Sequence, residues 1–284
     1  MPFSIDILQQ TQSLVMIALL VVLLAWEQIN PFYNFFSRSV KRKGKHDLRN
    51  LFVGLVNALL VSGVFVALWA MGSDWSYEER FGLLHRFELG TVAHFIMAVL
   101  LLDLWMYIWH RMNHEIRFFW RFHRVHHSDP HMDVTTASRF HVGEIFFSSL
   151  FRIPLIILLG IWVGELLLYE TIAFAVVQLH HSDVGLPPTL DRMLRGVIVS
   201  PFMHKIHHSR WRPETDSNYG SLFSFWDRIA RTFRMRDLQG FKTLRIGLDE
   251  FDDPKYETVK NIFRLPLLKI QREEEEQKPE KQQQ

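Results

Sequence analysis

Four long apolar runs restrict this chain to helices that lie in a membrane. They cover residues 13–30, 51–71, 91–109 and 145–179. A helical crossing of the bilayer takes about 20 apolar residues, and the backbone within it must satisfy its own hydrogen bonds. The first three runs each predict one span. The fourth is slightly short for two crossings, and Gly160, Gly164 and Glu165 indicate a bend, so it predicts a helical hairpin with both ends on one side.

Charged residues beside these runs predict an orientation. The segment 38–50 carries six basic residues and one acidic residue, and the positive-inside rule makes it a cytoplasmic loop. The segment 72–90 carries four acidic and two basic residues, as expected for an external loop. The first run follows no Lys or Arg and precedes no small-residue cleavage site, which favours a retained span over a signal peptide. The third run then ends at the cytoplasmic face.

Histidines gather in three short clusters. Five lie in the eighteen residues from 110 to 127, and three more lie between 204 and 208. Spacings of three and four place imidazoles on one face of a helix. A single histidine is more often an ordinary core or surface residue, but eight clustered ones predict metal binding, because neutral imidazole binds iron, zinc, copper and nickel. A zinc site uses three or four ligands, so eight predict two metals. They are His110, His114, His123, His126, His127, His204, His207 and His208.

The clusters HRMNH, HRVHH and HKIHH resemble the HxxxH, HxxHH and HxxHH boxes of the sterol desaturase and fatty acid hydroxylase superfamily, which are membrane di-iron oxygenases. The flanking segments WRFHRVHHS, TASRFH, LHHSDVGLP and DSNYGSLFSFWDRIARTF are similar too. The similarity spans about residues 95–235. It implies an all-α integral membrane protein with about three spans plus a helical hairpin, and a cytoplasmic helical cap that carries a histidine-rich dimetal site.

The resemblance also implies ligands and cofactors. Two iron ions are expected, with zinc a further candidate in purified protein, held by the eight boxed histidines and by His181. Asp183 departs from the asparagine that is usual after that histidine. Four carboxylates could orient a ligand imidazole, with a solvated or ion-paired surface group as the alternative for each: Glu115, Glu144, Asp129 and Asp227. His141 also resembles a family position, and orienting a ligand imidazole is its alternative role.

The remaining polar residues receive other roles. His46 and His85 are expected to be solvated loop residues, His94 a polar contact, and His131 and His180 bystanders. Asp103, at membrane depth, is expected to face protein or a cavity. Trp226, Asp227 and Arg228 are expected to lock the cap.

The chain divides into four parts on this interpretation. Residues 1–90 hold the first spans and the basic loop, and 91–235 form the catalytic domain. Residues 236–270 form a cytoplasmic extension, and 271–284, without apolar residues, are expected to be disordered.

The resemblance implies oxidation of a membrane lipid, such as a sterol or a fatty acyl chain, by O2 and two electrons. Hydroxylation is preferred over desaturation because it needs one hydrogen abstraction rather than two. The chain has no cysteine for an iron–sulfur cluster and no glycine-rich dinucleotide fingerprint, so a separate ferredoxin, cytochrome or reductase is expected to supply the electrons. A net charge of +2 gives no reason to expect nucleic acid.

Two other classes of protein remain open. A membrane zinc hydrolase would use histidine ligands, but its HExxH signature is missing here. A metal transporter or haem protein would bind without catalysis. Transporter ligands lie near the bilayer midplane, whereas these histidines lie at helix ends, and a bis-histidine haem would leave six of them unused.

Overall fold

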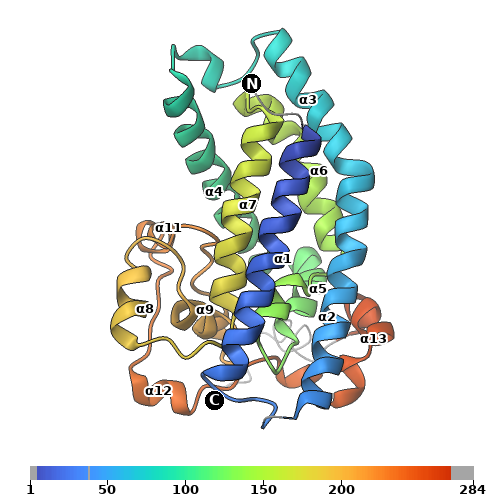
Figure 1. Cartoon of the computed structure of the whole chain (residues 1–284), viewed down its shortest axis with the longest axis vertical. Coiled ribbons are helices and arrows are strands. Elements are labelled where there is room, and N and C mark those ends of the chain that lie inside the picture. The colour runs from blue at the N-terminus through green and yellow to red at the C-terminus, as the bar shows by residue number, and fades with distance from the viewer. Residues whose placement is uncertain (1–4, 38, 270–284) are drawn as a thin grey trace, which may run out of the picture.

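The structure, a computed structural model, describes residues 5–37 and 39–269. Long helices stand side by side as a bundle, and short helices cover one end of it (Figure 1). The described residues contain three isolated β-bridges and no strand. The all-α prediction is therefore confirmed, and the predicted tail at 271–284 lies outside the described residues.

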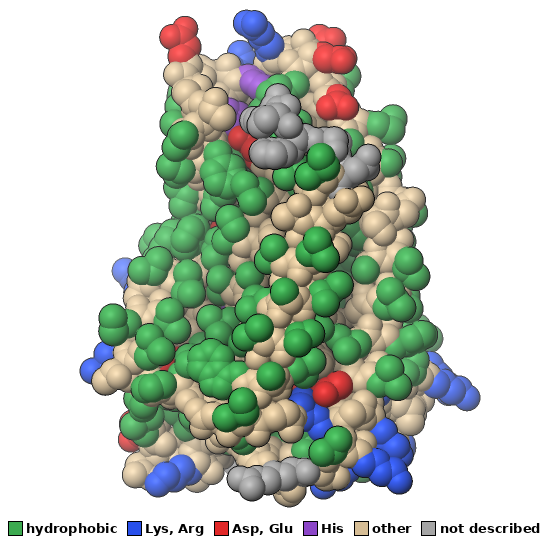
Figure 2. Space-filling view, in the orientation of Figure 1, with side chains coloured by type: hydrophobic (Ala, Val, Ile, Leu, Met, Phe, Trp, Pro, Cys, Tyr) green, Lys and Arg blue, Asp and Glu red, His purple; other side chains and the backbone are tan. Residues whose placement is uncertain are grey.

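Five helical segments are long and apolar enough to cross a bilayer: Ile7–Ile29, Val40–Glu78, Thr91–Glu115, Val142–Leu159 and Val163–His181. They belong to α1 (Ile5–Ile29), to α2 (Val40–Leu60) with η1 (Val61–Phe65) and α3 (Val66–Glu78), to α4 (Thr91–Glu115), to α6 (Val142–Leu159) and to α7 (Val163–His181). Apolar side chains cover the middle of the face seen in Figure 2, and charged ones gather at its two ends. The hairpin bends where it was expected: Gly160 ends α6 with a left-handed φ of 74°, which glycine adopts without strain.

The basic segment is not the loop that the sequence suggested. Its residues from Val40 onward begin α2, which continues through a π-helical turn into α3 as one 39-residue helix. The prediction that His46 is solvated is wrong, because its side chain is 2% exposed and its Nε2 lies 3.0 Å from Asp129. Lys43 binds Asp133 at 2.7 Å. These carboxylates belong to a segment distant in sequence. Their contacts with Lys43 and His46 bury one side of the start of α2.

The covered end of the bundle carries α5 (Arg117–His127) and the 3-10 turn η3 (Val134–Ser138). Beyond the hairpin lie α8 (Pro188–Leu194), α9 (Pro201–His207), α10 (Arg212–Thr215), α11 (Phe225–Ile229), α12 (Leu238–Lys242) and α13 (Val259–Arg264). The C-terminal part packs on α5: the buried guanidinium of Arg124 donates to the carbonyl of Leu265 at 2.6 Å. Trp120 and Val125 share a core cluster with Ile262 and Leu265.

Asp103 joins the bundle to this cap. The carboxylate is fully buried on α4 and accepts hydrogen bonds from Tyr169 at 3.0 Å, from the Phe223 amide at 3.0 Å and from the Trp226 indole at 2.9 Å. Asp227 accepts from the amides of Tyr219 and Gly220, both at 2.8 Å. Arg228 donates to the Arg195 carbonyl at 2.7 Å. The expectation that residues 226–228 lock the cap agrees with these bonds.

Candidate metal centre

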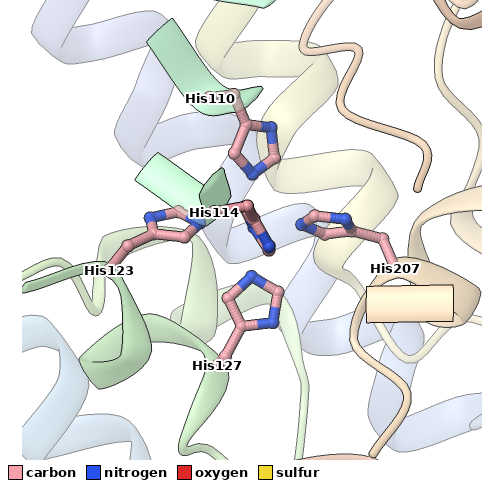
Figure 3. Close-up of side chains that lie close together, drawn as sticks. All are labelled: His110, His114, His123, His127 and His207. Carbon is pink, nitrogen blue, oxygen red and sulfur yellow. The ribbon is translucent and has the colours of Figure 1, made fainter. Parts of the chain in front are cut away.

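The structure gathers five of the boxed histidines into one group, although they come from three helices. We call it group one: His110 and His114 of α4, His123 and His127 of α5, and His207 of α9. One nitrogen of each ring lies within 4.8 Å of the others. The five rings point toward a common centre (Figure 3). Helix α4 contributes two ligands to one side because residues four apart share a face.

The other predicted histidines form group two, which consists of His126, His181, His204 and His208. The Nε2 atoms of His126 and His181 lie 3.0 Å apart, those of His181 and His204 3.0 Å, and those of His204 and His208 3.2 Å. Nitrogens on one metal, with bonds of about 2.0–2.1 Å, lie roughly 3.0–3.4 Å apart. The spacing of group two therefore fits a shared metal ion.

The two HxxHH boxes contribute to both groups. In the second box, His123 and His127 are four residues apart and enter group one, while His126 enters group two. In the third box, His204 and His208 enter group two and His207 enters group one. Adjacent residues on a helix point about 100° apart. The paired histidines of each box thus connect the two groups, and the rings of His127 and His208 stack at 4.4 Å.

Nearby oxygens orient the rings. The Nδ1 of His110 lies 2.8 Å from the Tyr219 carbonyl, that of His207 lies 2.6 Å from the Ser217 carbonyl, and that of His114 lies 3.3 Å from Asp216. The segment 216–219 thus serves three histidines. These oxygens can only accept, so each Nδ1 carries the proton and donates it. The Nε2 lone pairs are left for a metal.

Several ring nitrogens have no hydrogen-bond partner among the described residues. They include the Nε2 atoms of His110, His114, His123 and His207, and both nitrogens of His127. Burial, reinforced by neighbouring imidazoles, holds the pKa values of His126, His127, His204 and His208 well below the usual range. Burial lowers the pKa of His207 to about 3, although its bond to Ser217 opposes the shift. These rings are neutral at pH 7, so each carries one N–H and leaves the lone pair of its other nitrogen available for a metal.

Such a donor set fits a metal that prefers nitrogen. Buried polar atoms are normally paired, and converging lone pairs repel one another unless a cation lies between them. Iron and zinc both accept imidazole nitrogen. The residues present could therefore hold one metal ion in each group.

The residues proposed to orient ligands divide into two sets. Glu144 contacts a clustered histidine directly, since its Oε1 lies 2.8 Å from the Nδ1 of His123. Asp227 acts one step away, through the Tyr219 backbone that receives His110. Glu115 instead pairs with Arg111 at 2.7 Å and is half exposed. Asp129 binds His46, and His141 caps α6 by accepting from the Gly143 amide at 2.9 Å.

Sequence reasoning missed Asp216 and the carbonyls of Ser217 and Tyr219. Their segment was noticed as DSNYG, but a backbone acceptor leaves no signal in side-chain identity. His94 is a polar contact as expected, with its Nδ1 2.8 Å from Glu165. His180, expected to be a bystander, contacts His204, with ring centres 3.9 Å apart and ring planes tilted by 32°.

A cavity of about 380 Å³ runs from the histidines into the bundle. Residues of both groups form one end of it, including His110 and His123 from group one and His126, His181 and His204 from group two. Apolar side chains such as Met16, Val61, Met106 and Phe174 line the rest. It lies among α1, α2, α4, α6 and α7, at the depth of the apolar spans. The cavity therefore extends from the histidines into the apolar part of the bundle.

These features define a class: a membrane protein of helices with two adjoining all-histidine groups at one end of an apolar cavity. Comparison with known proteins identifies the family. Residues 95–232 match the fatty acid hydroxylase family. Across these residues the chain belongs to the sterol desaturase and fatty acid hydroxylase superfamily, and it is an integral membrane protein.

Three relatives illustrate the range of the family. The chain is 24% identical over 238 residues to the ornithine lipid hydroxylase OlsE of Rhizobium tropici, covering 78% of this chain and 66% of the relative. It is 26% identical over 232 residues to alkylglycerol monooxygenase of Danio rerio, covering 79% and 47%. It is 26% identical over 143 residues to human cholesterol 25-hydroxylase, covering 50% and 51%. The alignments thus span about half to two thirds of these relatives. No solved structure matches the chain significantly.

Proposed function

We propose that this protein is a membrane di-iron oxygenase that uses O2 and two electrons to hydroxylate a lipid. One observation carries the proposal: nine histidines form two adjoining groups at the end of an apolar cavity within the bilayer-depth helices. The names of the relatives, which are lipid hydroxylases and monooxygenases, support it. Desaturation is the alternative outcome of the same chemistry.

In this proposal each group holds one iron ion. Iron bound there would supply the activation of O2 that attack on an unactivated C–H bond requires. The protein orients the ligands through Glu144, Asp216, Ser217 and Tyr219, whose oxygens accept the Nδ1 protons. Burial of the histidines keeps bulk water away from the reacting atoms. The cavity holds the hydrocarbon chain against them.

The histidines are proposed to face the cytoplasm. Figure 1 shows α5, α9 and the start of α2 at one end of the bundle, and α5 and α9 carry histidines of both groups. Lys and Arg side chains gather at that end in Figure 2, so the positive-inside rule favours a cytoplasmic position for it. The electrons are proposed to come from a separate ferredoxin, cytochrome or reductase. The exposed Lys41, Arg42 and Lys45 could attract an acidic donor.

The test begins with metal counting. The full chain, purified in detergent and reconstituted with iron without oxygen, should bind two iron ions and show a Mössbauer spectrum of a coupled pair. Addition of O2, reductant and a membrane lipid extract should then give products heavier by sixteen mass units. A loss of two mass units would instead indicate desaturation.

Variants separate the two groups. His207→Ala removes a ligand from group one only, and His208→Ala removes one from group two only. Each should lower the iron content toward one per chain and abolish turnover. The proposal is wrong if both variants keep two irons, or if the zinc-loaded protein hydrolyses lipids without oxygen.

A further inference from the structure

The wall of the cavity beside the histidines carries three oxygen atoms with no hydrogen-bond donor among the described residues: Asn57 Oδ1 of α2, Asn113 Oδ1 of α4 and Glu144 Oε2 of α6. We call these residues the acceptor triad. Their side chains are deeply buried, with exposed fractions of 8%, 1% and 5%. All three line the same cavity.

The orientation of each side chain follows from its partner. Asn57 Nδ2 donates to the Phe140 carbonyl at 2.8 Å, and Asn113 Nδ2 donates to Glu144 Oε1 at 3.3 Å. Each amide donates one N–H of its NH2 group to an acceptor, and its oxygen has no partner among the described residues. Glu144 uses Oε1 for His123, which leaves Oε2. The triad therefore presents three unpaired acceptor oxygens to the cavity.

The triad lies beside both histidine groups. Glu144 contacts His123 of group one, and Asn113 precedes His114 on α4. Asn57 holds Phe140, whose ring stacks on His126 of group two with centres 4.2 Å apart and planes within 10°. A group bound by the triad would thus lie next to the histidines. Arg152 is the only Lys or Arg among the described residues that line the cavity, and it is paired with Glu170.

Buried acceptors are costly to leave unpaired, and a ligand that provides donors recovers that cost. A carboxylate or phosphate placed there would bring its own oxygen lone pairs against three unpaired acceptor oxygens, which is unfavourable. We infer that the acceptor triad binds a hydrogen-bond donor of the substrate beside the carbon that is attacked, so that the substrate is a lipid with a hydroxyl or N–H group at that position. This inference rests on the proposed lipid oxygenation and deepens it by naming the substrate class.

The test measures binding with oxygen excluded. Radiolabelled hexadecane-1,2-diol is bound to the metal-loaded full chain in detergent, and the unlabelled diol, its dimethyl ether and hexadecanoate compete with it. The diol should compete about fivefold to tenfold better than the ether, the effect of one hydrogen bond. Hexadecanoate should compete no better than the ether. Equal competition by diol and ether would overturn the inference, because the triad would then bind water alone.

Variants assign the preference to the triad. Asn57→Leu and Asn113→Leu should each reduce the preference for the diol to within about twofold while the metal content stays unchanged. Gln12→Leu is the matched control, since it removes the same amide from the other end of the same cavity; it should keep the preference. A preference that persists in both asparagine variants would overturn the inference. A chain that prefers the diol but oxygenates no lipid would refute the proposed function, while the binding of a hydrogen-bond donor by the acceptor triad would still hold.

Discussion

At the scale of single residues, the carboxylates of Glu144 and Glu115 differ in what they contact. Glu144 is buried and accepts from a clustered histidine, whereas Glu115, one residue after His114, pairs with Arg111 in partial solvent. The sequence proposed both carboxylates for the same role, and only their contacts distinguish them. Helix α4 ends at Glu115, and its side chain points away from the face that carries His110 and His114.

We therefore expect Glu144→Leu to weaken metal binding by roughly 10- to 100-fold, the usual effect of removing a partner that orients a histidine ligand. The matched substitution Glu115→Leu should change metal binding little. Metal retained against a graded chelator, measured by mass spectrometry, checks both. Equal retention by the two variants would show that the Glu144 contact does not support the site.

The spacing of the boxes predicted eight of the nine clustered histidines, because periods of three and four place side chains on one face of a helix; the ninth, His181, was predicted from the family resemblance. What it could not predict is how they divide. His126 and His127 are neighbours in sequence yet enter different groups, since adjacent residues point in different directions: His126 meets His181 of α7, and His127 meets His207 of α9. The backbone acceptors could not be predicted either, because the backbone carbonyl of Tyr219 is chemically the same as that of any other residue.

At the scale of helices, α6 and α7 are joined by an ion pair within the membrane-spanning part. Arg152 and Glu170 have side chains 16% and 18% exposed, and they lie on the cavity lining. The Arg152 guanidinium also lies over the Trp69 ring, 5.5 Å from its centre. Charges at this depth are costly when separated, so the pair holds the hairpin together only while both partners remain.

Removing one partner should therefore destabilise the protein more than removing both. Arg152→Leu or Glu170→Leu should each cost on the order of 3 kcal/mol, and the double variant should recover most of the loss. Arg111→Leu breaks the exposed pair with Glu115 and should cost about 0.5 kcal/mol or less. Melting in one detergent compares all four proteins. A double variant as unstable as the worse single one would contradict the role of the pair.

Hydropathy predicted the five long helical segments, because apolar runs of bilayer length are typical of membrane spans. The bend at Gly160 was also visible, because a glycine between two helical runs commonly ends the first. The basic segment was assigned wrongly to a loop: its charges suggested exposure, but Asp129 and Asp133 bind Lys43 and His46 from a distant segment. Tertiary pairing of this kind has no local signature.

At the scale of the whole molecule, the proposed orientation places Lys41 and Arg245 on the cytoplasmic side and Glu88 outside. Because the chain has no cysteine, single cysteines can be introduced without removing others. An impermeant maleimide should label Lys41→Cys and Arg245→Cys only in inside-out vesicles, and Glu88→Cys only in right-side-out ones. The reverse pattern would place the histidines on the external face.

The division of the histidine groups has a consequence for biogenesis. Group one needs His207 in addition to α4 and α5, and group two draws three of its four members from residue 181 onward. Group one cannot be complete before His207 has been synthesised, nor group two before His208. Loading with metal is thus a late event in translation, because a chain that stalls before residue 207 lacks a histidine of each group.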